Sequence, residues 1–219
     1  MPTLAQVNYV KARKELIQEP ILIVGSKLYD YDRFDFRSEL TKMGYCEITG
    51  IDLQPGQEVD YPVDLCDSNA SFYSEHACQY KTIICMSVLM CVPNPFVAAE
   101  NLTRVSAPQA VLFLSEPFIH KHTNMPKDYW RFTTNSFKAM FKSFLFQDAH
   151  FKMVITRSDA ESEYNPNRVM VHPYTRNSEE TAVGYILRKI NRKLLSKSIF
   201  RVPLFPEVAI YALGKKEST

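Results

Sequence analysis

ILIVG, at residues 21–25, and CEITGID, at residues 46–52, are the two segments that decide the fold. The first is an apolar run that ends in a glycine, which is typical of a strand buried on both faces. Between the two segments, Phe36, Leu40 and Met43 recur at the spacing of one helix face. A buried strand, a helix and a second strand in that order predict a parallel pair joined by a right-handed crossover.

The same alternation continues along the chain and predicts an α/β fold, a seven-stranded, mostly parallel sheet with helices on both faces. The last two strands are expected to form an antiparallel hairpin. The expected strands are residues 21–25, 46–52, 58–62, 82–87, 110–115, 150–156 and 207–214; the expected helices are residues 4–18, 96–104, 133–146 and 181–197, with one more that Asp32 caps and Gly44 closes. We expect a single domain over residues 1–219, made of an N-terminal helix (1–19), a core (20–157), a variable insertion with a basic helix (158–200) and a last strand (201–219).

Composition limits the classes of protein to which this chain can belong. Hydrophobic residues make up 46%, enough for a sizeable core, and only six residues are glycine, under half the average usage of about 7%. The net charge of +2 and a pI near 8.2 are too mild for a dedicated nucleic-acid binder. The five cysteines form no CxxC pair, no signal peptide is evident, and no apolar run exceeds about ten residues, so we expect a soluble, cytoplasmic protein.

Three predicted strands end in residues that suit an adenosine-like ligand, and the ends of parallel strands meet at one edge of a sheet. Gly25 is the only glycine in the turn after the first strand, so the GxGxxG fingerprint of pyrophosphate binding is absent. Asp52 can accept hydrogen bonds from both hydroxyls of a ribose, and Asp64 can accept one from an adenine that Leu65 covers. Alternatively, Gly25 merely ends a strand and Asp52 caps the turn at residues 54–56.

Two longer motifs carry a family resemblance, and they are GIDLQPGQEVDYPVDL at residues 50–65 and HKHTNMPKDYWRFT at residues 120–133. Together with GSKLYDYDRFDFRSEL (25–40) and TIICMSVLMCVPNPFVAAENLTRV (82–105), they make residues 20–147 resemble a class I S-adenosylmethionine-dependent methyltransferase of the methyltransferase-11-like group. The chain departs from the family's pattern in two places. Its loop after the first strand has one glycine, and Met90-Cys91 stands where the family often has Glu-His.

The resemblance implies S-adenosyl-L-methionine as the cofactor, held by residues 20–157. It implies contact with the methionine portion after the first strand, with the ribose after the second, with adenine after the third, and a cleft beside the methyl group after the fourth. The cofactor-binding residues that follow from it are Gly25, Ser26, Asp52, Leu53, Asp64, Leu65, Ser87 and Val88.

The segment after the fifth predicted strand, residues 116–133, gathers the polar and aromatic side chains expected of an acceptor site. His122 or His120 can take a proton from the acceptor, with Asp128 orienting the histidine. The expected substrate-binding residues are Tyr129, Trp130 and Arg131. Alternatively, Asp128 and Arg131 form an ion pair that folds this loop with Trp130 packed under it. His120, His122 and Asp128 could also bind a metal ion, but the sequence offers no firm third ligand, and we predict no metal.

The sequence therefore predicts a methyltransferase that acts on an oxygen or nitrogen of a small-molecule or glycan-like acceptor. The alternative is a non-catalytic, methyltransferase-like scaffold that acts through the basic segment 181–201, which has six Lys or Arg residues and no acid. That segment either docks on the domain or contacts an anionic membrane or an acidic partner. A nicotinamide oxidoreductase is disfavoured by the missing phosphate loop. A nucleic-acid methyltransferase is disfavoured by the weak charge and by Ser87-Val-Leu-Met90, where such enzymes have an Asn/Asp-Pro-Pro-Tyr/Phe tetrad.

Overall fold

A computed structural model of the chain describes residues 2–120, 122, 127–155, 160–163, 186 and 208–218. The chain divides into one unit of Met1–Tyr164 with Pro206–Thr219 and a second unit of Asn165–Phe205. Every helix and strand bounded below belongs to the first unit. The expected basic helix at 181–197 lies outside the described residues except for Ile186. The expectation of a single domain stays a prediction.

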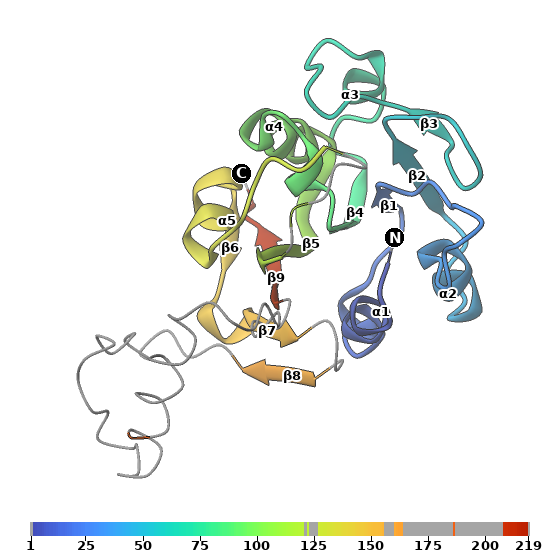
Figure 1. Cartoon of the computed structure of the whole chain (residues 1–219). Helices are drawn as coiled ribbons and strands as arrows, with labels where there is room; N and C mark the ends of the chain where they lie inside the picture. The colour runs from blue at the N-terminus through green and yellow to red at the C-terminus, as the bar shows by residue number, and fades with distance from the viewer. Residues whose placement is uncertain are drawn as a thin grey trace. The chain divides into compact units, whose positions relative to one another are not determined.

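The first unit is built on one mixed sheet whose strand order is β3-β2-β1-β4-β5-β9-β7-β8, with the short β6 also paired to β9 (Figure 1). The strands are β1 (Ile21–Val24), β2 (Ile48–Asp52), β3 (Tyr61–Pro62), β4 (Tyr80–Met86), β5 (Ser106–Ile119), β6 (Phe144–Phe146), β7 (Lys152–Ile155), β8 (Ala160–Glu163) and β9 (Val208–Lys216). The first five run parallel, and β9 is antiparallel to both β5 and β7. The predicted α/β fold, with its antiparallel final pair, is confirmed; β6 and β8 are short additions to the seven expected strands.

Helices cover both faces of the sheet. Successive residues of β1 point to opposite faces and therefore pack against different helices. Leu22 and Val24 pack with α3, α4 and α5, whereas Ile21 and Ile23 pack with α1 and α2. All four of these side chains are at most 3% exposed, as expected for a strand buried on both faces. The helices are α1 (Leu4–Lys11), α2 (Phe36–Lys42), α3 (Ser71–Glu75), α4 (Pro95–Val105) and α5 (Thr134–Met140), and the short 3₁₀ turns are η1 (Lys14–Leu16), η2 (Leu89–Cys91) and η3 (Asp148–His150).

Three predicted helix boundaries are wrong. The first helix ends at Lys11 instead of residue 18, since residues 11–15 offer no large apolar side chain to bury. The cap of α2 is Asp35, whose carboxylate accepts the N–H groups of the first turn, whereas Asp32 accepts the N–H of Tyr29 in the preceding loop. The helix expected to reach residue 146 stops at Met140. Residues 144–146 form β6 instead, pairing with β9.

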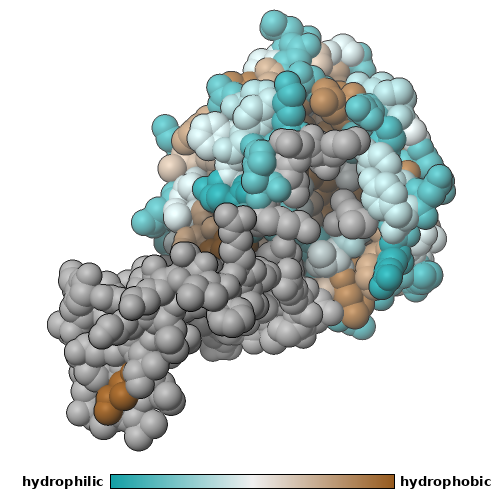
Figure 2. Space-filling view, viewed as in Figure 1, coloured by the Kyte–Doolittle hydropathy of each residue, from teal (hydrophilic) through white to brown (hydrophobic). Residues whose placement is uncertain are grey.

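Hydropathy varies over the face of the molecule in Figure 2, where much of the coloured surface is hydrophilic and apolar residues lie among the polar ones. Within the part of the chain that the structure describes, no helix is both long and apolar enough to cross a bilayer. The exposed large side chains include Tyr129 and Trp130, at 47% and 40% exposed.

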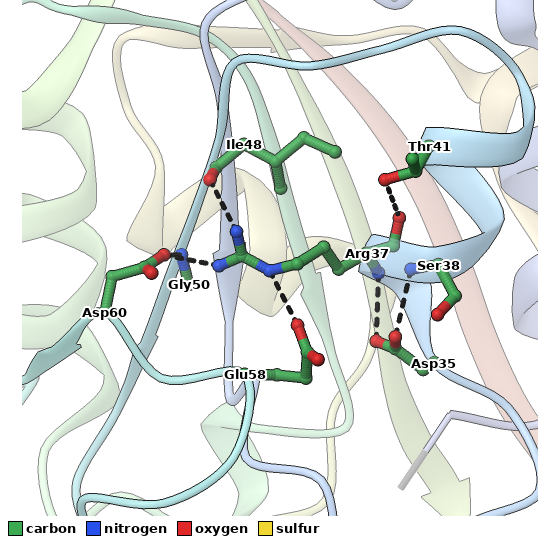
Figure 3. Close-up of polar contacts among 8 residues, drawn as sticks. All are labelled: Asp35, Arg37, Ser38, Thr41, Ile48, Gly50, Glu58 and Asp60. Carbon is green, nitrogen blue, oxygen red and sulfur yellow. Dashed lines mark hydrogen bonds and ion pairs between the residues drawn. The ribbon is translucent and has the colours of Figure 1, made fainter.

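Arg37 of α2 bonds to the first residue of β2 and to the connection between β2 and β3 (Figure 3). Its guanidinium donates to the carbonyl of Ile48 at 2.9 Å and forms ion pairs with Glu58, at 2.8 Å, and with Asp60. The Asp60 carboxylate in turn accepts the N–H of Gly50 at 2.7 Å. One cation therefore holds a strand and the loop that leaves it in a single arrangement.

This arrangement predicts that Gly50→Ala destabilises the protein. A Cβ at Gly50 would stand 2.3 Å from the backbone oxygen of Glu58 and 2.7 Å from Oγ of Ser26. Because a backbone atom cannot step aside as a side chain can, we expect a loss of about 1–3 kcal/mol in the free energy of unfolding, measured by urea titration.

Gly56→Ala is the matched control, because it adds the same methyl group a few residues further on, in the connection that follows β2. The Cβ at Gly56 would meet only the flexible side chain of Lys27, at 2.9 Å from Cε. We expect its unfolding free energy to stay within about 0.5 kcal/mol of that of the parent protein. Equal losses in the two variants would contradict this account of Gly50.

Candidate functional site

The strand register brings the predicted cofactor-binding residues to one edge of the sheet. Val24, the last residue of β1, pairs with Ile51 of β2 and with Cys85 of β4, and Met86 pairs with Ser115 of β5. The next residues of these strands therefore emerge at the same level, at the carboxyl ends, where doubly wound sheets bind their ligands. The residues that meet there are Gly25, Ser26, Asp52, Leu53, Ser87, Val88 and Glu116.

Gly25 begins the turn after β1, and two features require a glycine there. Its φ is +72°, in the left-handed region, and a Cβ would lie 2.6 Å from Cγ2 of Val88. The N–H groups of Gly25 and Ser26 both donate to the carbonyl of Ile51, at 2.8 and 3.0 Å. Oγ of Ser26 is buried and has no hydrogen-bond partner within the described residues. The turn after β1 thus packs closely against the end of β2 and against Val88 after β4. The hydroxyl of Ser26 is available to bond a ligand.

Asp52 lies at the end of β2 with both carboxylate oxygens turned to the loops of this edge. Oδ2 accepts the N–H of Lys27 at 3.3 Å, and Oδ1 accepts the N–H of Gln54 at 3.1 Å. The second contact is the turn cap that the sequence offered as the alternative role of Asp52. Each carboxylate oxygen has a further lone pair, so capping the turn leaves acceptors for ribose hydroxyls. Leu53, the next residue, is 67% exposed.

Asp64 and Leu65 follow β3 and differ sharply in environment. Asp64 is exposed, and its Oδ1 accepts the N–H of Cys66 at 2.8 Å. Leu65 is only 7% exposed and packs in the core on the face covered by α3, α4 and α5, and its carbonyl accepts from the amide of Asn101 at 3.0 Å. The carboxylate is accessible to a ligand, whereas the leucine side chain belongs mainly to the core.

Gln6 of α1 joins this edge through bonds that the sequence did not reveal. Thr3 and Gln6 form a capping box at the start of α1, in which the amide oxygen of Gln6 accepts the N–H of Thr3 at 2.8 Å. The amide nitrogen, however, reaches Oγ of Ser87 at 2.8 Å and Oγ of Ser115 at 3.2 Å. Gln6 is 2% exposed, and Ser87 has a φ of +58°, in the left-handed region. The N-terminal helix is therefore bonded directly to the ends of β4 and β5.

Glu116 of β5 is the second residue that sequence reasoning missed, although an acid inside an apolar strand is a signal. It is completely buried, and its carboxylate accepts three consecutive backbone N–H groups, from Val88, Leu89 and Met90, at 3.0, 2.8 and 3.0 Å. Burial raises the pKa of Glu116, and the three N–H donors act against that rise because they favour the ionised carboxylate.

The loop at residues 127–133 is folded by the ion pair that the sequence offered as an alternative. Arg131 donates to both oxygens of Asp128, one at 2.8 Å, and to the carbonyl of His120 at 3.2 Å. The Asp128 side chain is 1% exposed, and the pair raises the pKa of Arg131. Asp128 also lies 3.8 Å from Nδ1 of His122, which is 70% exposed. Catalysis by these histidines and Asp128 stays a prediction.

The aromatic residues of this loop, Tyr129 and Trp130, are 47% and 40% exposed. Trp130 donates its indole N–H to the carbonyl of Val92 at 2.9 Å, and the N–H of Tyr129 donates to the carbonyl of Met90 at 2.8 Å. Whether Trp130 packs under the loop or binds an acceptor stays a prediction. Both residues are tied to the turn after β4, beside the expected methyl position.

No cluster of three or more His, Cys, Asp or Glu side chains with the geometry of a metal site occurs among the residues that the structure describes. His120, His122 and Asp128 are all within that part of the chain. The metal alternative for this loop thus gains no support from the geometry.

The sequence matches no protein-family model and no curated protein. Solved structures are nevertheless similar in fold. An S-adenosylmethionine-dependent methyltransferase from Archaeoglobus fulgidus has a TM-score of 0.53 at 12% identity, covering 96% of this chain and 92% of that one. The 1,6-didemethyltoxoflavin-N1-methyltransferase of Burkholderia thailandensis, with S-adenosylhomocysteine bound, has a TM-score of 0.57 at 8% identity, covering 98% and 79%. A Bacillus halodurans protein described as a methyltransferase has a TM-score of 0.53 at 12% identity, covering 96% and 99%.

These similarities, together with the strand order, identify the fold as that of the class I S-adenosylmethionine-dependent methyltransferases. The identities of 8–12% are too low to place the chain in a subgroup, so the methyltransferase-11-like assignment stays a prediction.

The bonds of Gln6 predict that Gln6→Leu lowers the stability of the protein. Leucine has a similar size but leaves the N–H of Thr3 and the hydroxyls of Ser87 and Ser115 without this partner, and such losses in buried surroundings cost about 1–3 kcal/mol. Urea unfolding measures the change. The control is Gln57→Leu at an exposed glutamine. A Gln6→Leu variant as stable as the parent protein would show that these bonds contribute nothing.

Proposed function

We propose that this protein is an S-adenosylmethionine-dependent methyltransferase that transfers a methyl group to an oxygen or nitrogen of a small-molecule or glycan-like acceptor. The observation that carries the proposal is the meeting of Gly25, Asp52 and Ser87 at one carboxyl edge of a methyltransferase fold. The low net charge favours a small acceptor over a nucleic acid.

The residues at this edge fit the cofactor. Asp52 would hold the ribose, because two carboxylate oxygens with spare lone pairs match two hydroxyls. Asp64 would hold the adenine amino group, and the buried hydroxyl of Ser26, which has no partner within the described chain, would bond the polar methionine end. The closely packed turn at Gly25 would border the same end. When bound, S-adenosylmethionine supplies a methyl group on a positively charged sulfur.

On the acceptor side, the chain's task is to position a nucleophile and to remove its proton. Methyl transfer requires the acceptor atom in line with the sulfur–methyl bond, so positioning contributes most of the rate. Tyr129 and Trp130 would bind the acceptor through their exposed rings, with Arg131 holding the loop. His122, or His120, would take the proton, and Asp128, whose Oδ2 lies 3.8 Å from Nδ1 of His122, would orient that ring.

The experiment is a thermal-unfolding titration of the full chain with S-adenosylhomocysteine, the demethylated product. A ligand that binds only the folded state stabilises it, by about 2.7 kcal/mol at a hundred times its Kd, and we expect a clear rise in Tm. Asp52→Asn, which weakens an acceptor but keeps the size, should reduce that rise. Asp148→Asn, at an exposed aspartate paired with Lys138, is the control and should leave it unchanged.

Two outcomes would contradict the proposal at different levels. No rise in Tm at millimolar S-adenosylhomocysteine would exclude the cofactor. A rise without transfer of labelled methyl groups from S-adenosylmethionine to a broad panel of hydroxyl and amine acceptors would instead favour the non-catalytic scaffold.

A further inference from the structure

We propose that Glu116 is a positioning residue that fixes the turn after β4 and, through that turn, both walls of the site. One wall is the cofactor edge at Ser87 and Val88, and the other is the aromatic pair Tyr129 and Trp130. The inference rests on the proposed function for its chemistry, but the geometry that carries it is independent of any ligand.

The first step is the way in which Glu116 caps η2. The cap position of this turn is Val88, whose side chain cannot accept a hydrogen bond, and no side-chain cap is present. The first N–H groups of a helical turn lack partners within it. Glu116 supplies those partners from a different strand, with Oε1 bonded to the N–H groups of Val88 and Leu89 and Oε2 bonded to that of Met90. A carboxylate on β5 thus does what a capping side chain would do locally.

The second step leads from this turn to the aromatic wall. The carbonyl of Met90 accepts the N–H of Tyr129, and the carbonyl of Val92 accepts the indole N–H of Trp130. Met90 is therefore bonded on one side to Glu116 and on the other to Tyr129. A shift of the turn would move the backbone that sets the position of both rings.

The third step leads from the turn to the cofactor edge. Val88 approaches Gly25 so closely that a Cβ on the glycine would stand 2.6 Å from its Cγ2. Ser87, just before it, is held in the left-handed region by its N–H bond to the carbonyl of Ser115 and by the amide of Gln6. The Glu116 cap therefore fixes the residue that packs against the loop expected to border the cofactor.

The cost of burying Glu116 indicates a specific role. Burying an ionisable group costs free energy unless hydrogen bonds to that group compensate for the lost water. An apolar side chain at this position of β5 would avoid the cost. Burial raises the pKa of Glu116, whereas its bonds to the three N–H groups of the turn lower it, because they favour the ionised form. The thiols of Cys85 and Cys91 interact electrostatically with Glu116, and burial raises their pKa values as well. The two acceptor oxygens of the carboxylate together satisfy the three N–H donors of this turn.

The test uses Trp130, the only tryptophan of the chain, as a reporter of its own wall. Glutamine has nearly the size of glutamate but one acceptor oxygen, so Glu116→Gln leaves at least one N–H of the turn without a partner. We expect this variant to show increased acrylamide quenching of Trp130 without ligand and to bind S-adenosylhomocysteine about tenfold more weakly in calorimetry. Glu100→Gln, at an exposed glutamate of α4, should change neither property.

Two results decide the proposal. Unchanged quenching in Glu116→Gln, or unchanged affinity for S-adenosylhomocysteine, would overturn it. If the parent protein does not bind S-adenosylhomocysteine, the proposed function fails, and the quenching of Trp130 still tests the positioning role by itself.

A second measurement covers the case in which the variant does not fold. In the unmodified protein, the amide hydrogens of Val88, Leu89 and Met90 should exchange with deuterium as slowly as those of β4, since each is bonded to a fully buried carboxylate. Exchange of these three amides at the rate of exposed loops would overturn the proposal.

Discussion

The register of β1 with its two neighbours is the constraint on which the rest of this structure depends. Because β1 pairs in parallel with both β2 and β4, three chain segments must leave the sheet at the same edge and at the same level. This register pairs Ile21–Val24 with residues 48–51 on one side and with residues 82–85 on the other, and all four side chains of β1 are buried in the core. The candidate site follows from this constraint: its residues are those that emerge where these strands stop.

Hydrogen bonds and ion pairs between residues far apart in the sequence then join the segments around this sheet. Arg37 holds the connection after β2, Gln6 bonds the ends of β4 and β5, and Glu116 caps the turn that lies between the cofactor edge and the aromatic loop. In each case one buried or half-buried side chain satisfies several groups from distant segments. Such groups are costly to bury alone, so each set of bonds specifies one arrangement of its loops.

The sequence predicts the strands well because the physics that forms them is local. An apolar run such as residues 21–25 predicts a strand that is buried on both faces. Polar residues at the ends of such strands, such as Asp52 at the end of the second one, predict the edge of the sheet at which a ligand would bind. Gln6 and Glu116 escaped prediction because their partners lie up to 109 positions away, and no local pattern encodes such a pair. The prediction of Asp32 as a cap failed for a related reason, since Asp35 precedes the same apolar stripe and only the loop geometry distinguishes the two residues.

The central claim is that the carboxyl edge of this sheet binds S-adenosylmethionine, and a crystal structure of the full chain with S-adenosylhomocysteine tests it most directly. We expect the ribose hydroxyls within hydrogen-bond distance of the Asp52 carboxylate, adenine beside Asp64 and the sulfur close to Ser87. A ligand bound elsewhere, or a ribose that makes no contact with Asp52, would contradict it.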